Sequence, residues 1–187
     1  MTSWRASPTP STKDPMSSDG WKKGLLAAGW NLRKALELAT YVEEMGTDLY
    51  RRLAKHWESE PTLRDLFAKL ALDEVAHREV FQTLLSTVRI RRSDPVSLDV
   101  ECLRTIAQTS FFSAGSGALR GIEDSVTEAE VLGKVFKFEK ATLLYYLGLR
   151  DVLGASTALD RIVAEEKRHT VYVMHACASL EAAPATP

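Results

Sequence analysis

Two stretches of the chain carry the same arrangement of acidic, aromatic and imidazole side chains, and this repeat constrains the fold strongly. In each stretch a Glu is followed seven residues later by a Tyr and, further along, by a Glu-x-x-His sequence. The first contains Glu43, Tyr50, Glu74 and His77, and the second contains Glu139, Tyr146, Glu166 and His169. Residues three apart project from one side of an α-helix. The repeat therefore predicts two helical segments that present metal-ligand side chains.

The surrounding sequence predicts helices, because apolar residues recur at helical spacing and strictly alternating runs are absent. Asn31 suits a helix N-cap, Pro61 a first helical residue and Gly154 a C-cap. Thr127 and Glu130 match a capping box. The predicted helices cover about residues 31–57, 61–88, 98–108, 127–154 and 156 or 157–180. Four long helices in two antiparallel hairpins, joined by a long crossover at residues 89–126, predict an all-α, ferritin-like four-helix bundle.

The four repeated glutamates are expected at similar heights in this bundle. Glu43 lies 16 residues before the turn that begins at Ser59, and Glu74 lies 13 residues after the second helix begins. At about 1.5 Å per residue, these spacings are roughly 24 and 20 Å along the helix axes. The corresponding values for Glu139 and Glu166 in the second hairpin are about 22 and 15 Å. Each hairpin therefore brings two carboxylates toward one level.

Carboxylates on apolar helix faces cost at least several kcal/mol to bury unless their charge is compensated. Two divalent cations would neutralise four carboxylates. A Glu from each of two helices, with Glu-x-x-His from the other two, is the ligand arrangement of ferritin-like di-iron and di-manganese proteins. The sequence therefore predicts a dinuclear metal site. Its predicted ligands are Glu43, Glu74, His77, Glu139, Glu166 and His169.

The chain resembles the rubrerythrin family at these residues, in the strings ALELATYVEEMGTDLYRRLA, FAKLALDEVAHREVF, FKFEKATLLYYLGL and RIVAEEKRHTVYV. The resemblance implies two iron ions, although manganese and zinc accept the same ligands. It assigns Glu43 and His77 to one metal, Glu139 and His169 to the other, and Glu74 and Glu166 to both as bridges. Glu44 competes with Glu43 for the first role, but the seven-residue step to Tyr50 favours Glu43.

Two features depart from the rubrerythrin pattern. Rubrerythrins proper carry a C-terminal rubredoxin domain, and this chain has only Cys102 and Cys177, far apart. We therefore expect two free thiols, and a separate electron-donor protein as the source of electrons. Typical rubrerythrins also have an extra Glu one turn after the third-helix ligand, where this chain has Thr142. This difference weakens the case for a specialised peroxidase and predicts a more symmetric site.

Four further residues are candidates for contact with the metal ligands. Asp73 and Glu165 each precede a predicted glutamate ligand and could accept a hydrogen bond from a ligand histidine, fixing its tautomer. The alternative for both is a solvated carboxylate. Tyr50 and Tyr146 could reach across the bundle to ligand carboxylates, and plain core packing is the alternative.

The composition sets limits on domains and partners. The 187 residues suit one bundle at 21–182, preceded by a disordered N-terminal arm at 1–20 and followed by a frayed C-terminus at 183–187. A net charge of −1 gives no reason to expect a nucleic-acid partner. The absence of a long apolar stretch or signal-peptide pattern predicts no membrane partner and a cytoplasmic location. The apolar segment at residues 21–30 suits packing either on the bundle or on a partner subunit, and we expect a homodimer.

Redox chemistry at the metal pair is the leading functional expectation. Iron held by these ligands would reduce H2O2 or O2, in a peroxidase- or ferroxidase-like reaction. One alternative is a di-iron hydroxylase of an organic substrate, which an apolar pocket beside the metals would favour. The other is a non-catalytic iron-binding or storage protein.

Overall fold

The computed structural model describes residues 31–87, 98–111, 121–154 and 156–182, and these residues form helices with no strand among them. The four long helices are α2 (Leu32–His56), α3 (Pro61–Thr87), α5 (Glu128–Leu153) and α6 (Thr157–Ala182), and a shorter helix is α4 (Leu98–Ser110). The prediction of an all-α, ferritin-like bundle is confirmed. The predicted arm at 1–20, the segment at 21–30 and the C-terminus at 183–187 lie outside the described residues.

The helix ends follow from local chemistry. Asn31 caps α2, because its Oδ1 accepts a hydrogen bond from the Lys34 N–H at 3.1 Å. Thr127 caps α5 in the same way through the Glu130 N–H at 3.2 Å. Gly154 follows α5 with a φ of 79°, a conformation that glycine adopts without the steric cost of a Cβ. These features confirm the predicted cap residues, although the Glu130 carboxylate accepts a hydrogen bond from the Val126 N–H and not from the Thr127 N–H of a capping box.

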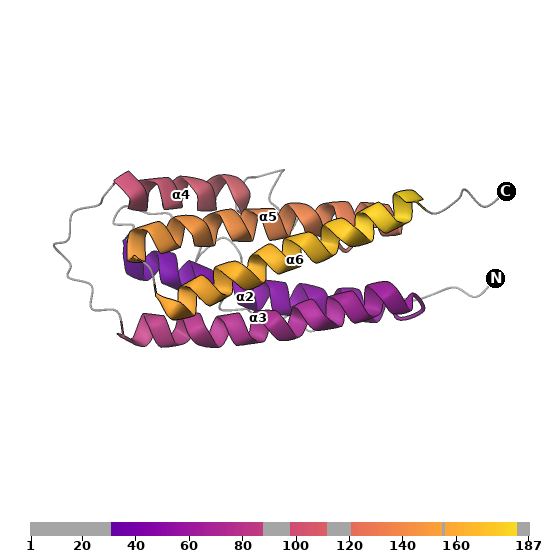
Figure 1. Cartoon of the computed structure of the whole chain (residues 1–187), viewed down its shortest axis with the longest axis horizontal. Helices are drawn as coiled ribbons and strands as arrows, with labels where there is room; N and C mark the ends of the chain where they lie inside the picture. The colour runs from indigo at the N-terminus through magenta and orange to yellow at the C-terminus, as the bar shows by residue number, and fades with distance from the viewer. Residues whose placement is uncertain (1–30, 88–97, 112–120, 155, 183–187) are drawn as a thin grey trace, which may run out of the picture.

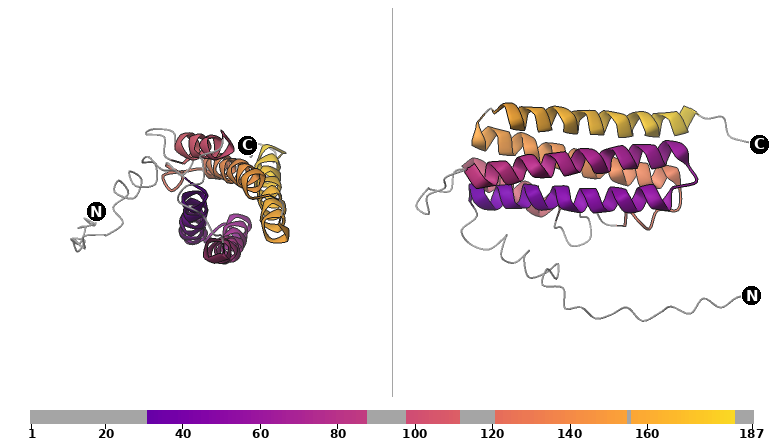
Figure 2. Two further views of the ribbon diagram at one scale, coloured as in Figure 1. Left: turned by 90° about the vertical axis from the view of Figure 1, so that its left-hand side faces the viewer. Right: turned by 90° about the horizontal axis from the view of Figure 1, so that it is seen from below.

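The helices form two antiparallel hairpins, α2 with α3 and α5 with α6, as Figures 1 and 2 show. Contacts between the hairpins join α2 to α5 and α3 to α6, and α4 packs against α5 and α2. Since α3 and α5 run in the same direction, the chain between them must return along the length of the bundle. This connection is the predicted long crossover, and it places α4 beside the bundle.

Buried apolar side chains from all four long helices fill the space between them. In α2 the buried positions include Ala35, Ala39 and Val42, which recur at four- and three-residue steps and so line one helical face. Tyr145 of α5 is fully buried and donates a hydrogen bond to the Ala35 carbonyl of α2 at 2.9 Å, tying the two hairpins together. No helix among the described residues combines the length and apolar character needed to span a membrane.

Candidate metal centre

The six predicted ligands lie inside the bundle and face one another. Each is at most 1 % exposed. Glu43 comes from α2, Glu74 and His77 from α3, Glu139 from α5, and Glu166 and His169 from α6. Glu44, the competitor of Glu43, is exposed to solvent. The four long helices thus bring the six predicted residues together. Burial of Glu43 and exposure of Glu44 favour Glu43 as the candidate ligand.

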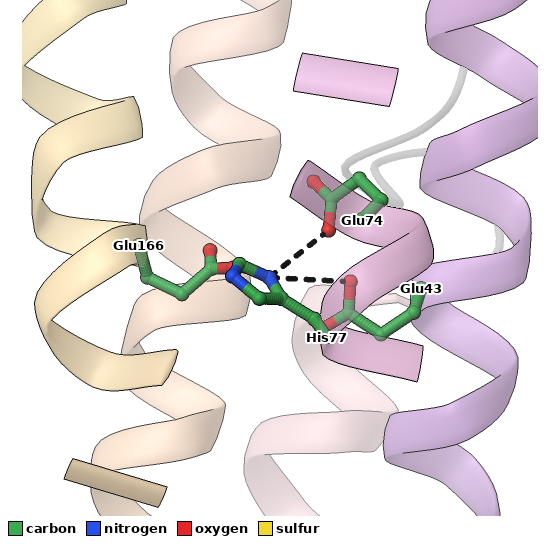
Figure 3. Close-up of side chains that lie close together, drawn as sticks. All are labelled: Glu43, Glu74, His77 and Glu166. Carbon is green, nitrogen blue, oxygen red and sulfur yellow. Dashed lines mark ion pairs between the residues drawn. The ribbon is translucent and has the colours of Figure 1, made fainter. Parts of the chain in front are cut away.

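One group of ligand atoms surrounds the Nδ1 atom of His77. This nitrogen lies 2.9 Å from Glu166 Oε1, 3.5 Å from Glu74 Oε2 and 3.8 Å from Glu43 Oε2. Figure 3 shows the four side chains converging from α2, α3 and α6. One ligand atom from each lies within 4.8 Å of the others. The group therefore has the size and donor types of a site for one metal ion.

A second group surrounds the Nδ1 atom of His169. This nitrogen lies 3.5 Å from Glu139 Oε2, 3.8 Å from Glu166 Oε1 and 4.0 Å from Glu74 Oε1. Glu74, Glu139 and His169 form the second cluster of ligand atoms within 4.8 Å of one another. Glu74 belongs to both clusters, and Glu166 approaches both imidazoles. This arrangement suits two adjacent ions with two shared carboxylates.

The outer nitrogen of each imidazole contacts a carboxylate from the other hairpin. His77 Nε2 lies 2.9 Å from Glu165 Oε2, and His169 Nε2 lies 3.1 Å from Asp73 Oδ2. In the tautomer that donates its Nε2–H to this carboxylate, Nδ1 keeps a lone pair directed at the cluster. Asp73 and Glu165 are thus placed as the sequence suggested, but each serves the histidine of the opposite hairpin.

The two tyrosines also bind across the hairpins. Tyr50 of α2 donates its hydroxyl hydrogen to Glu139 of α5, and Tyr146 of α5 donates to Glu43 of α2. Both tyrosines are fully buried. Tyr50 therefore orients a carboxylate of the second cluster and Tyr146 one of the first, and this crossed pattern gives the site an approximate twofold symmetry.

Seven buried ligand-type atoms in this cluster make no hydrogen bond. They are Glu43 Oε2, Glu74 Oε2, His77 Nδ1, Glu139 Oε2, both carboxylate oxygens of Glu166, and His169 Nδ1. Buried polar atoms without partners are costly and rare in folded proteins. Here they point into one space, and they are oxygen and imidazole donors that iron, manganese and zinc accept. The donor set therefore fits two metal ions.

The electrostatics show how strongly the cluster attracts positive charge. Burial, followed by repulsion from Glu74, raises the pKa of the other three glutamates, that of Glu166 to about 8. Burial opposes protonation of His169, but its hydrogen bond to Asp73 and the nearby carboxylate of Glu139 outweigh it and raise its pKa to about 11. The pKa of His77 is also raised despite its burial, chiefly by Glu166. In the metal-free protein, bound protons therefore supply the positive charge that metal ions would otherwise bring.

Basic side chains that brace Asp73 and Glu165 were not predicted. Lys69 Nζ lies 2.6 Å from Asp73 Oδ2, and Arg161 Nε lies 3.1 Å from Glu165 Oε1, both one helical turn away. Their four-residue spacing from an acidic partner is a signal that the sequence contains. At Glu165 the arginine holds the carboxylate oxygen that does not contact His77, whereas at Asp73 the lysine and His169 share Oδ2. Each basic side chain thereby helps to fix the position of the carboxylate that contacts a histidine.

Loss of the outer carboxylates is expected to weaken metal binding without removing a ligand. Asp73→Ala and Glu165→Ala should each lower zinc affinity about 10–100-fold, because the imidazole loses the contact that fixes its tautomer. Competition with a chromophoric chelator measures this change. Glu79→Ala is the matched control, since Glu79 is an exposed carboxylate on α3. Equal zinc affinities for all three variants would show that the contacts of Asp73 with His169 and of Glu165 with His77 do not support metal binding.

A groove with a volume of about 690 Å³ lies between α3 and α6, beside the candidate centre. Its surface is mostly apolar, but its lining joins aliphatic residues such as Val80 and Ile162 to the polar or charged His77, Arg161 and Glu165. Glu165 contacts His77 at Nε2, whereas Nδ1 lies within the buried cluster. The groove thus reaches the outer edge of His77 and not the side that faces the metal positions.

The fold and the cluster define the class of protein as a ferritin-like helical bundle with a buried carboxylate–histidine site able to hold metal ions. The rubrerythrin family model matches residues 34–106, which span most of α2, all of α3 and most of α4. The match confirms the resemblance to rubrerythrins over these residues, which include Glu43, Glu74 and His77. No curated protein and no solved structure matches the chain.

Proposed function

We infer that the protein is a di-iron oxidoreductase of rubrerythrin type that reduces H2O2 or O2. The observation that carries this proposal is the convergence of seven unpaired, buried ligand atoms on one space between the four helices. Glu43 and His77 would hold one iron and Glu139 and His169 the other, with the carboxylates of Glu74 and Glu166 between them. The bound iron pair would supply the electrons that the oxidant takes up.

The chain's own residues prepare the site for this chemistry. Asp73 and Glu165 keep a proton on the outer nitrogen of each imidazole, so that Nδ1 is available inside the cluster. Tyr50 and Tyr146 orient Glu139 and Glu43 through their hydroxyl groups. Burial of all six ligands excludes bulk water and strengthens the electrostatic interactions within the site.

The electrons would come from a separate donor protein. Cys102 lies on α4 and Cys177 on α6, and no disulfide joins these two described residues. They are the only cysteines of the chain. Two cysteines cannot provide the four thiolates of a rubredoxin-type iron site. Complete reduction of H2O2 to two molecules of water takes two electrons and two protons, which this donor and the solvent would provide.

The groove between α3 and α6 bears on the hydroxylase alternative. It is the kind of apolar space that an organic substrate needs, and its volume lies within the range of small-molecule sites. It borders the Nε2 edge of His77, however, so a ligand there would be held away from the metal-facing nitrogen. This geometry favours reduction of a small oxidant over hydroxylation of a substrate in the groove.

Metal analysis and rapid mixing test the proposal. Protein loaded anaerobically with ferrous iron should contain two iron ions per chain and should oxidise them faster than free ferrous iron on mixing with H2O2 or O2. Two bound iron ions without accelerated oxidation or peroxide consumption would indicate the iron-binding alternative. A stoichiometry well below two that Glu166→Ala leaves unchanged would refute the dinuclear site itself.

A further inference from the structure

One interior position of α2 next to the cluster has no side chain. Gly46 lies one turn after Glu43, and a Cβ built on it would be 3.4 Å from both Cγ and Cδ of Glu74 and 3.5 Å from its Oε1. These are ordinary van der Waals distances, so alanine would fit the observed arrangement. Glycine inside a helix is less stable than alanine. Static packing therefore does not require glycine here.

Glycine at position 46 leaves the place of a side chain empty beside the Glu74 carboxylate. Glu74 belongs to both ligand clusters, and its Oε2 makes no hydrogen bond. Glu43 and Glu139, by contrast, each accept a hydrogen bond from a buried tyrosine. Glu43 and Glu139 are thus each held by a tyrosine, whereas Glu74 has no such hydrogen bond at Oε2, and the α2 position that it contacts carries no side chain.

The approximate twofold symmetry of the site breaks at this position. Thr142 of α5 lies three residues after Glu139, as Gly46 lies three residues after Glu43. Thr142 is buried, and its hydroxyl donates a hydrogen bond to the Phe138 carbonyl at 3.0 Å. The first hairpin therefore has a glycine at this position, whereas the second hairpin has a threonine.

We propose that Gly46 is a positioning residue, whose missing side chain leaves the space into which the Glu74 carboxylate turns when a small exogenous ligand binds the metal pair. The proposal rests on the dinuclear site of the proposed function. A methyl group at position 46 would occupy this space while leaving the resting carboxylate in place. The site should then still hold its metals but resist the entry of a further ligand.

Azide binding to the cobalt-loaded full-length chain tests this inference without enzymatic turnover. Visible absorption of Co²⁺ reports both metal content and azide binding. Gly46→Ala is expected to hold two Co²⁺ ions per chain and to bind azide at least about tenfold more weakly than the unmodified protein, because filling the space opposes the carboxylate movement. Gly133→Ala is the matched control, since Gly133 lies within α5 and a Cβ there would meet nothing within 4 Å.

The outcomes separate the inference from the function on which it rests. Unchanged azide affinity in Gly46→Ala, or an equal loss in both variants, would overturn the inference and leave the dinuclear site standing. A Gly46→Ala protein with fewer than two Co²⁺ ions would also overturn it, because the methyl group would then disturb the resting site. Fewer than two Co²⁺ ions in the unmodified protein would instead refute the proposed dinuclear centre.

Discussion

A Glu74→Ala variant is expected to retain the helical fold but to hold at most one metal ion per chain instead of two. Glu74 is the carboxylate common to both ligand clusters, and its oxygens approach the Nδ1 atoms of both His77 and His169. Its loss should also slow the reaction with H2O2 by more than the roughly 10–100-fold that loss of an outer partner costs. Metal analysis after anaerobic loading and stopped-flow mixing measure the two effects.

Glu44→Ala provides the control for this experiment. Glu44 is an exposed carboxylate on α2, adjacent in sequence to the buried Glu43. Its removal changes the net charge as Glu74→Ala does but removes no atom from the cluster, so metal content should remain at two. Circular dichroism checks that both variants are helical. Retention of two metals in Glu74→Ala would show that the shared carboxylate does not act as a ligand.

Metal loading is expected to stabilise the fold by about 4 kcal/mol when the free metal concentration is about 1,000 times the dissociation constant. For a chain of this size, the melting temperature should rise by roughly 8–16 °C. The physical reason is that the metal-free cluster buries four carboxylates, whose charges repel one another, with ligand atoms that lack partners. Thermal unfolding followed by circular dichroism, with zinc and then with excess EDTA, measures the difference.

The size of this stabilisation should increase with pH. The pKa of Glu166 is raised from 4.5 to about 8, chiefly by burial and then by Glu74, and the pKa of His169 is raised from 6.5 to about 11. The folded, metal-free protein therefore binds more protons than the unfolded chain, so its stability falls as pH rises from about 4.5 to about 11. Metal ions displace these protons and bind more tightly at high pH.

The Glu166→Gln variant separates the effect of Glu166 ionisation on stability from the effect of metal binding. The amide cannot ionise, so the metal-free variant should lose less stability than the unmodified protein between pH 6 and pH 9, and it should gain little from zinc. Metal-free protein whose unfolding free energy does not change across this pH range would contradict the raised pKa values. An undiminished zinc effect in the variant would contradict the assignment of Glu166 as a ligand.

Much of the fold and the ligand set follows from local sequence patterns. Asn31, Thr127 and Gly154 fix helix ends by interactions within a few residues, and the Glu-x-x-His spacing places Glu74 and His77 on one face. The constant rise of a helix converts residue counts into heights, which is why the positions of the four glutamates could be compared in advance.

Only the tertiary structure decided which residues from different hairpins meet. It paired Asp73 with His169, Glu165 with His77 and Tyr50 with Glu139, and it placed the open groove between α3 and α6. These contacts depend on the rotation and crossing angle of packed helices, which sequence spacing within one helix does not specify.

The repeated pattern of candidate metal ligands was thus determined by the sequence alone. The orientation of the site was not: Nδ1 faces the cluster in both histidines, and Glu43 lies in the cluster whereas Glu44 is exposed to solvent. The physical reason is that helix formation is governed by neighbours along the chain, whereas the direction and partners of a buried side chain are set by helices that pack from distant parts of it.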